Sequence, residues 1–396
     1  MVLIVLTVAS CFGAGAQQIA YAEAFTPVEF CPGQTLCPGK NRRIKNVKIL
    51  QQAGARPRWS PQGDAIVFDR QNADGYYDVY LTTFRGSSVI SLTENKPGIG
   101  QKNNGNAIFH PPGNYIVFIS EEEDHLGERS KWLADPGLGL FSNLWVTNRS
   151  GDRFWKLTNI PAKKRLLDKI PAMGVVNPNF SLDGTVLVWT ERYAAGGHHN
   201  WGLWRLMTAK FSAINHQPKL DNPQVLFLPK KGNYVTSMGF IDAQRLLLAG
   251  NLEGQHEYGM DQYVYNIRTG ELINLQNSPS IWEEGACMAL NGRYIVYMSN
   301  AASKHQIDFN NPDWPTQPTE RDYWVMDIGG KNKERLTYFN DPSAPEYLGK
   351  RVIVAACGLS PDGRFLAGSL GVDFGNERRA RLQLKIVLLE FEEPLK

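Results

Sequence analysis

The chain has 396 residues, enough to bury a large core, and its 37 glycines and 23 prolines indicate many turns rather than long helices. Its formal net charge is only +3, and no run of lysine and arginine exceeds three residues. Because proteins that bind nucleic acid usually present a concentrated basic face, we exclude nucleic acid as a partner.

The first residues combine an apolar stretch with small residues. An Ala14-Gly15-Ala16 step that suits signal peptidase follows the apolar stretch, which is too short to span a bilayer. We therefore predict a signal peptide over residues 1–16 and an extracytoplasmic mature protein, either periplasmic or secreted. The four residues that end at Cys11 also resemble a bacterial lipobox, which would attach a lipid to Cys11 and anchor the chain to a membrane. Cleavage after Ala16 is the alternative to lipidation.

Residues 17–44 form a predicted N-terminal extension. Cys31 and Cys37 flank a Pro-Gly loop in this extension and are candidates for a disulfide in an exported chain. A zinc site is the weaker interpretation, because no second cysteine pair and no spaced histidines accompany them. Cys287 and Cys357 fall within apolar strands, where buried thiols are the usual arrangement.

From about residue 45 onward, one pattern occurs six times: a short apolar strand, a small or polar turn, and a second apolar strand. The copies begin at residues 56, 106, 177, 237, 285 and 356, and the first reads RPRWSPQGDAIVFD. A third strand follows each copy, as in YDVYLTTF from Tyr77, and a fourth follows five of them, as in SVISLT from Ser88. Such a unit cannot bury its own apolar faces and must stack on its neighbours, so the repeat predicts a β-propeller.

The sixth copy reaches the end of the chain after its third strand. The segment NVKILQQ from Asn46 stands just before the first copy, in the place that a fourth strand occupies elsewhere. Pairing this segment into the last blade would close the ring and remove the exposed edges of an open array. We therefore predict an all-β fold over residues 45–396. It is a six-bladed β-propeller of four-stranded antiparallel blades, with the last blade closed by an N-terminal strand.

Several segments resemble a known repeat. The phrases WSPQG at Trp59, FSLDG at Phe180 and LSPDG at Leu359, with NRSGDRFWKLT from Asn148, are similar to the TolB-type propeller repeat. The resemblance covers residues 45–396 and implies a propeller without the α/β domain of TolB, so it does not imply TolB's role in envelope integrity. Prolyl-oligopeptidase-like enzymes use similar repeats beside a hydrolase domain, but this chain contains no G-x-S-x-G nucleophile elbow.

Histidines concentrate in the loops that join second to third strands, where five of the seven occur. In a propeller these loops emerge on one face, together with the connections between blades. The candidates for a ligand-binding face are His125, Trp132, His198, His199, Trp201, His256, Tyr258, His305, Asp313 and Trp314. Imidazole and carboxylate suit zinc, manganese or iron, which makes His198, His199, His256 and His305 the candidate ligands of a divalent metal. Polar loops of exported proteins also collect such residues without a metal, and we expect no cofactor.

The first strands of a propeller line its central channel, with alternate side chains pointing inward. Aligning the six copies identifies polar candidates for this lining: Arg56, Asn106, Asn177, Ser237 and Glu284. Such a lining suits a small polar ligand or only ordered water, and water is the simpler expectation.

No catalytic residue is assigned, because the sequence shows no nucleophile motif, matched acid–base pair or cofactor fingerprint. The leading hypothesis is an exported, monomeric, non-enzymatic scaffold whose loop-rich face binds a protein or a cell-envelope component, such as a glycan. Membrane contact is expected only through a lipid anchor. The alternative is a metal-dependent lyase or hydrolase that acts on a carbohydrate at the same face, because some secreted-type sugar-acid lyases pair similar repeats with a histidine-bound metal.

Overall fold

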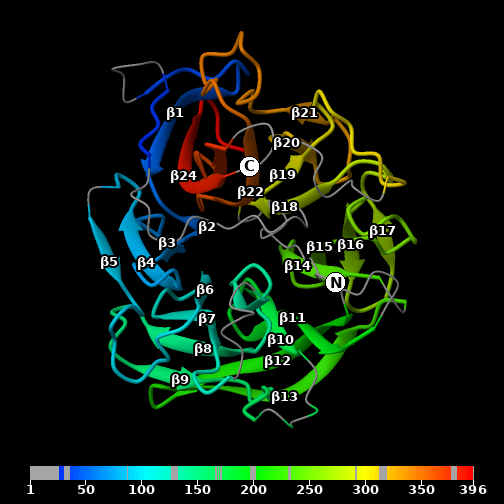
Figure 1. Ribbon diagram of the computed structural model, residues 1–396. Coiled ribbons are helices and arrows are strands. Elements are labelled where there is room, and N and C mark those ends of the chain that lie inside the picture. The colour runs from blue at the N-terminus through cyan, green and yellow to red at the C-terminus, as the bar shows by residue number, and fades with distance from the viewer. Residues whose placement is uncertain are drawn as a thin grey trace.

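The computed structural model describes residues 26–395 except 31–35, 87, 126–132, 166, 168, 170–171, 197–201, 231–232, 290–291, 312–318 and 376–380. The described residues form 24 strands in six four-stranded antiparallel sheets, arranged as blades around a central axis (Figure 1). The predicted all-β, six-bladed propeller is therefore confirmed. No helix in the described part of the chain is long and apolar enough to cross a membrane.

The first strand of blades 1 to 5 lies nearest the axis (Figure 1), and the others follow outward in chain order; in blade 6, β22 is innermost and β1 outermost. Blade 1 contains β2 (Ala55–Trp59), β3 (Ala65–Gln71), β4 (Tyr77–Thr83) and β5 (Val89–Ser91). Blade 2 contains β6 (Asn104–Phe109), β7 (Tyr115–Glu121), β8 (Ser142–Asn148) and β9 (Phe154–Lys156). Blade 3 contains β10 (Gly174–Phe180), β11 (Val186–Ala194), β12 (Leu203–Ile214) and β13 (Gln217–Phe227).

The second half of the ring repeats this order. Blade 4 contains β14 (Val235–Phe240), β15 (Arg245–Gly250), β16 (Asp261–Asn266) and β17 (Leu272–Asn274). Blade 5 contains β18 (Glu283–Met288), β19 (Tyr294–Ser299), β20 (Asp322–Asp327) and β21 (Glu334–Arg335). Blade 6 contains β22 (Val352–Leu359), β23 (Phe365–Asp373) and β24 (Leu382–Phe391), completed by β1 (Ile44–Gln51).

Blade 6 is built from both ends of the chain. Strand β1 pairs antiparallel with β24 from Ile44 opposite Phe391 to Gln51 opposite Ile386, as the adjacent blue and red strands of Figure 1 show. The predicted closure by the N-terminal strand is confirmed. Because the ring is closed, each blade buries its apolar faces against two neighbours.

Hydrogen bonds from serine explain the repeated turns between first and second strands. The Ser60 hydroxyl donates to the Asp64 carboxylate at 2.6 Å and accepts from the Ala65 backbone N–H at 3.0 Å. Gly63 in the same turn has a φ of 72°, which glycine adopts readily. In blade 6, the Ser360 hydroxyl accepts from the Phe365 backbone N–H at 2.9 Å. These phrases therefore stabilise turns.

The repeated Leu-Thr pairs fasten the fourth strand to the third. The Thr93 hydroxyl accepts from the Val79 backbone N–H at 2.9 Å and donates to the buried Asp78 carboxylate at 2.7 Å. In blade 5, the Thr337 hydroxyl donates to the buried Asp322 carboxylate at 3.0 Å. Burial raises the pKa of Asp78 to about 6. The Thr–Asp pairs thus provide partners for polar groups inside the blades.

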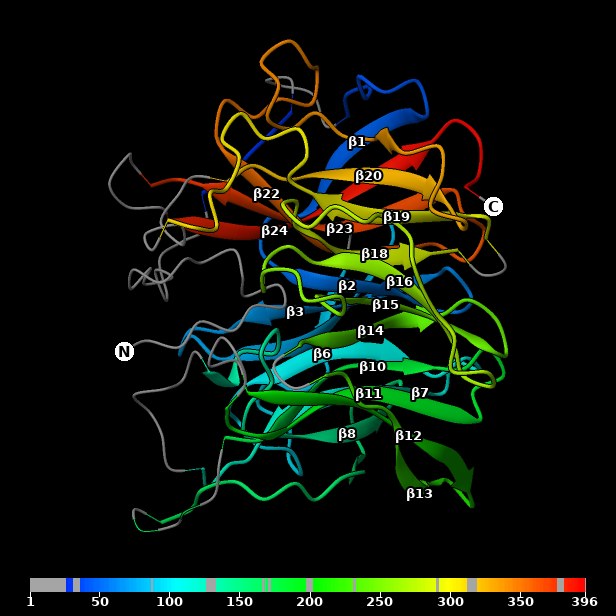
Figure 2. The same ribbon diagram turned by 90° about the vertical axis from the view of Figure 1, so that its right-hand side faces the viewer.

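Blade 3 departs from the predicted strand lengths. In the sequence, the segment QVLFLP from Gln224 matches the fourth strands of the other copies and predicts a short fourth strand, but β12 extends to Ile214 and β13 already begins at Gln217. Asn215 and His216 form the tip of this hairpin, and their φ values of 52° and 59° fit a tight two-residue turn. The hairpin projects from the side of the ring opposite the second-to-third-strand loops (Figure 2).

Candidate functional site

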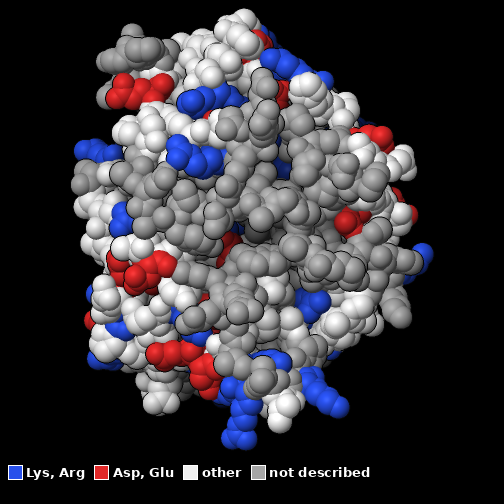
Figure 3. Space-filling model, viewed as in Figure 1, with Lys and Arg blue, Asp and Glu red and all other residues white. Residues whose placement is uncertain are grey.

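The loops joining second to third strands and the connections between blades share one face, as predicted. In blade 2, the Glu121 backbone N–H donates to the carbonyl of Asn103 at 2.8 Å, and Asn103 belongs to the connection from blade 1. The Phe141 N–H donates to the carbonyl of Met173, in the connection to blade 3, at 2.6 Å. We call this side of the ring the loop-rich face. It faces the viewer in Figure 3, where acidic side chains gather over blades 1 and 2.

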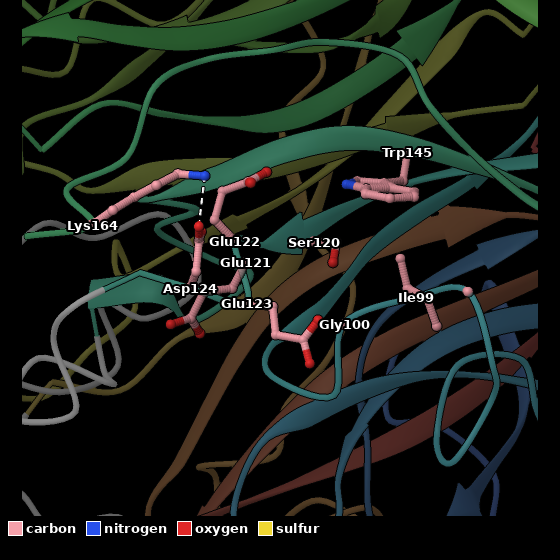
Figure 4. Close-up of a pocket in the computed structure, with 10 residues that line it drawn as sticks. Ile99, Gly100, Ser120, Glu121, Glu122, Glu123, Asp124, Trp145 and Lys164 are labelled. Carbon is pink, nitrogen blue, oxygen red and sulfur yellow. Dashed lines mark ion pairs between the residues drawn. The ribbon is translucent and has the colours of Figure 1, made fainter.

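A cleft of about 600 Å³ opens on the loop-rich face at blade 2. Its lining comes from the connection that precedes blade 2, from the end of β7 and the loop after it, from β8, and from the connection to blade 3. The lining residues are Gly98, Ile99, Gly100, Ser120, Glu121, Glu122, Glu123, Asp124, Trp145 and Lys164. In Figure 4 the acidic side chains lie between Lys164 at one end and Trp145 and Ile99 at the other.

Lysines hold most of the cleft carboxylates in place. The Nζ of Lys164 lies 2.6 Å from Asp124 Oδ2, and the Nζ of Lys156 lies 2.6 Å from Glu122 Oε1. Glu122 Oε1 also accepts a hydrogen bond of 2.7 Å from Asn143 on β8. Glu123 is exposed and forms no ion pair with any residue that the structure describes. Within the described part of the chain, the rim of the cleft therefore carries one carboxylate without a cationic partner.

The aromatic wall of the cleft is Trp145, which is half-buried on β8. The Nζ of Lys156 lies 5.9 Å from the centre of its ring. A cation above an aromatic face is attracted by the negative potential of the ring, and carboxylates nearby strengthen that attraction. The cleft can therefore accept a second cationic group, such as a lysine or arginine side chain.

His125 supports the blade 2 loop from beneath. Its ring is buried and stacks on Phe141 with centroids 3.7 Å apart, and its Nδ1 lies 3.4 Å from Glu121 Oε1. This packing fixes the loop that carries Glu122 to Asp124. Trp132, the other candidate in this loop, lies outside the described residues.

His256 and Tyr258 pack where blades 4 and 5 meet. The His256 ring is half-buried and stacks on Phe309 of the blade 5 loop, with centroids 4.4 Å apart. Tyr258 is buried, and its ring lies 4.5 Å from that of Trp282. His305 is exposed in the same blade 5 loop. The structure thus brings His256 and the blade 5 loop together through aromatic stacking.

The metal site stays a prediction. Among the described residues, no group of three or more His, Cys, Asp or Glu side chains is placed to hold one metal ion. The candidates that lie outside the described residues are His198, His199, Trp201, Asp313 and Trp314. Cys31 also lies outside them, whereas Cys37 is buried and exchanges backbone hydrogen bonds with Val47. The predicted disulfide between Cys31 and Cys37 is therefore untested.

Three channel candidates form a belt across neighbouring blades. The Asn106 side-chain amide donates to Asn177 Oδ1 at 2.9 Å, and the Asn177 amide donates to Thr236 Oγ1 at 2.6 Å. Both Asp69 carboxylate oxygens accept the Asn106 backbone N–H at 3.0 Å, and Arg56 Nε donates to Asp69. The belt therefore links the inner strands of blades 1 to 4 through side-chain hydrogen bonds.

The belt residues occupy β-bulges with a left-handed backbone. Arg56, Asn106 and Asn177 have φ values of 52°, 52° and 49°, an arrangement that non-glycine residues rarely adopt. Each lies at a break in register between the first and second strand of its blade. The repeated bulge turns these side chains toward the neighbouring blade.

The remaining channel candidates, Ser237 and Glu284, are also buried. Ser237 accepts a hydrogen bond of 3.3 Å from the Asn179 amide. Glu284 is 2% exposed, and its Oε2 accepts a hydrogen bond of 3.3 Å from Trp282 Nε1. Burial raises the pKa of Glu284 to about 7, although the nearby Arg321 opposes the shift. Glu284 is thus a titratable group near neutral pH inside the ring.

Sequence reasoning selected His125 and Trp132 from the blade 2 loop but missed the walls of the cleft. Glu121 to Asp124 accompany His125 in the sequence, whereas Trp145, Lys164 and the glycines at 98 and 100 belong to other segments. Only the alternation of β8 gave a signal for Trp145, because this half-buried residue stands between the buried Leu144 and Val146.

No protein-family model and no curated protein matches the sequence. Among solved structures, the chain is similar to TolB from Acinetobacter baumannii, with a TM-score of 0.47 and 13% identity over 87% of this chain and 65% of that one. It is also similar to an oligogalacturonate lyase in complex with manganese, with a TM-score of 0.49 and 12% identity over 93% of this chain and 97% of that one. A third similar structure is prolyl oligopeptidase B from Galerina marginata, with a TM-score of 0.46 and 10% identity over 86% of this chain and 43% of that one. These values are too low to transfer an activity, a substrate or a partner to this chain.

Proposed function

We propose that this protein is an extracytoplasmic, non-enzymatic binding scaffold whose loop-rich face binds a protein component of the cell envelope. The observation that carries the proposal is the cleft at blade 2, where an aromatic wall and a row of carboxylates meet. Its volume of about 600 Å³ lies within the usual range of ligand sites. The cleft takes a lysine or arginine side chain that the partner presents.

The charges of the cleft favour a cationic group in a fixed place. Lys164 and Lys156 hold Asp124 and Glu122 through ion pairs of 2.6 Å, so these carboxylates are positioned before any partner arrives. Glu123 supplies the negative charge that remains on the rim. Preorganised groups lose less conformational freedom on binding, and opposite charge speeds encounter with a basic surface.

The location outside the cytoplasm rests on the first sixteen residues, which lie outside the described part of the chain. Mass spectrometry of the native N-terminus distinguishes the two forms of export. A mature chain that starts at Gln17 fits free release after cleavage at Ala16, and a lipidated Cys11 fits anchoring in a membrane. An intact Met1 on protein taken from the cytoplasm of the native host would contradict export.

A titration with a defined cationic probe tests the cleft. Fluorescence anisotropy follows the binding of a fluorescein-labelled hexalysine peptide at low salt. Replacing Glu123→Gln and Asp124→Asn together should weaken binding several-fold, because two rim carboxylates are removed.

The charge-matched control is Glu392→Gln with Glu393→Gln, two exposed residues at the C-terminal end, which lies on the opposite side of the ring (Figure 2). This control should leave peptide binding unchanged. Equal weakening by the two double variants would show that the peptide responds only to net charge and would contradict a cationic site in the cleft.

A further inference from the structure

Two buried cysteines of neighbouring blades lie in contact. The Sγ of Cys287 on β18 is 2.7 Å from the Sγ of Cys357 on β22, although the two residues are 70 positions apart in the sequence. Cys287 is 7% exposed and Cys357 is fully buried. The sulfur–sulfur distance exceeds the disulfide bond length of about 2.05 Å by only about 0.7 Å.

The backbones of these two first strands approach each other closely. Gly285, which precedes Cys287 in the β18 bulge, has a φ of 61°, and a Cβ there would lie 3.3 Å from the backbone of Ala355 and Ala356 on β22. The Cys357 thiol also donates a weak hydrogen bond of 3.3 Å to the Gly285 carbonyl. Strands β18 and β22 lie side by side in Figure 1. The cysteines therefore meet where the strand backbones already approach each other.

The same position serves as a link between blades elsewhere in the ring. Asn179 pairs with Val188 in blade 3 as Cys287 pairs with Val296 in blade 5. The Asn179 side-chain amide donates to the Ser237 carbonyl of blade 4 at 3.2 Å. Blade 3 thus uses a hydrogen bond where blade 5 has a thiol that faces a second thiol.

We propose that Cys287 and Cys357 form a disulfide that covalently joins blades 5 and 6 when the protein meets a disulfide oxidant. The Cys287 thiolate attacks a low-molecular-weight disulfide such as oxidised glutathione and releases one thiol. The Cys357 thiolate then attacks the mixed disulfide and releases the second thiol. Two protein thiols lose two electrons and two protons, and the oxidant gains them as two thiols.

The order of attack follows from exposure. Cys287 is 7% exposed and Cys357 is fully buried, so the external disulfide reaches Cys287 first once the two blades open or before they have packed. Burial raises the pKa of the Cys357 thiol well above its ordinary value, so little of it is ionised and it is the less reactive of the two thiols towards an external disulfide. Closure is therefore faster while blades 5 and 6 are still assembling than in the finished ring.

The bond would reinforce the blade that closes the ring. Strand β22 contacts blade 1 on its other side, where Trp59 Nε1 donates to the Gly358 carbonyl at 3.0 Å. Blade 6 is also the blade that pairs β24 with the N-terminal β1. A disulfide between β18 and β22 therefore ties the composite blade to a blade made from one continuous segment, and opening of the ring at this junction would require its reduction.

Peptide mapping tests the bond directly. The purified protein is refolded with oxidised glutathione, unfolded in the presence of iodoacetamide, and digested with trypsin. We expect one species in which the peptide of residues 269–293 is joined to that of residues 352–364, which contain Cys287 and Cys357. Reduction before alkylation should separate them. Quantitative alkylation of both cysteines in the oxidised sample, or glutathione retained on Cys287, would overturn the proposal.

Thermal unfolding gives a second readout, with Cys37→Ser as the matched control. Closing a loop of this length should raise the Tm of the oxidised wild type over its reduced form by roughly 5–10 °C. Cys37→Ser should keep this difference, whereas Cys287→Ser and Cys357→Ser should lose it. A difference that persists in Cys287→Ser and disappears in Cys37→Ser would assign the bond elsewhere and contradict the proposal. Peptide mapping needs only the wild type, so a variant that fails to fold does not prevent the test.

Discussion

Replacing Glu284 by glutamine should stabilise the protein above neutral pH. Glu284 is 2% exposed, and burial raises the pKa of its carboxyl from an ordinary 4.5 to about 7. The folded state therefore holds its proton more tightly than the unfolded state. The stability that the protonated Glu284 carboxyl contributes is fully present below pH 4.5 and is lost as the pH rises through 7. A shift of this size corresponds to about 3 kcal/mol, since each pKa unit is worth about 1.4 kcal/mol.

Glutamine keeps the shape of the protonated carboxyl and does not ionise. Urea denaturation at a series of pH values should give equal free energies of unfolding for Glu284→Gln and wild type near pH 4.5. Glu284→Gln should become more stable by about 3 kcal/mol at pH 8. The exposed Glu271→Gln is the control and should follow the wild type. A difference that does not change with pH, or a variant less stable than wild type at pH 8, would refute the reasoning.

Three further predictions concern the scaffold, the loop support and the metal. Asp322→Ala removes the buried carboxylate that accepts a hydrogen bond from Thr337, and the groups that it pairs with stay buried. The free energy of unfolding measured by urea denaturation should therefore fall by about 3–5 kcal/mol. A decrease below about 1 kcal/mol would contradict the role of the Thr–Asp pair. His125→Ala should lower the Tm and weaken hexalysine binding indirectly, because the ring stacked on Phe141 supports the acidic loop; unchanged Tm and binding would contradict this support. Elemental analysis of the native protein should find no stoichiometric transition metal, and a metal released by His199→Ala would favour the carbohydrate-acting enzyme instead.

The fold was predictable because the information that specifies it is local and repeated. Turn residues such as Ser60 and Ser360 hydrogen-bond within five positions, so the phrase that recurs in blades 1, 3 and 6 produces the same turn in each of them. The N-terminal closure followed from one missing strand at the other end. The long hairpin of blade 3 escaped prediction, because Asn215 and His216 resemble ordinary loop residues until their left-handed backbone is seen.

The candidate site was less predictable because its contacts join segments that are distant in sequence. Asp124 could be seen beside His125, but its ion pair with Lys164 crosses from one loop to another. The histidines were chosen for metal chemistry, yet His125 and His256 use their rings for stacking. Contact between Cys287 and Cys357 depends on how two blades meet, which no local pattern reveals.

Site-specific photo-crosslinking in the native host tests whether the loop-rich face binds a partner protein. p-Benzoylphenylalanine is placed at residue 123 on the cleft rim or at residue 393 on the opposite side, both exposed positions. We expect position 123 to cross-link to one defined protein, hexalysine to compete with this product, and position 393 to give no such product. The same product from both positions, or a product only from position 393, would contradict it.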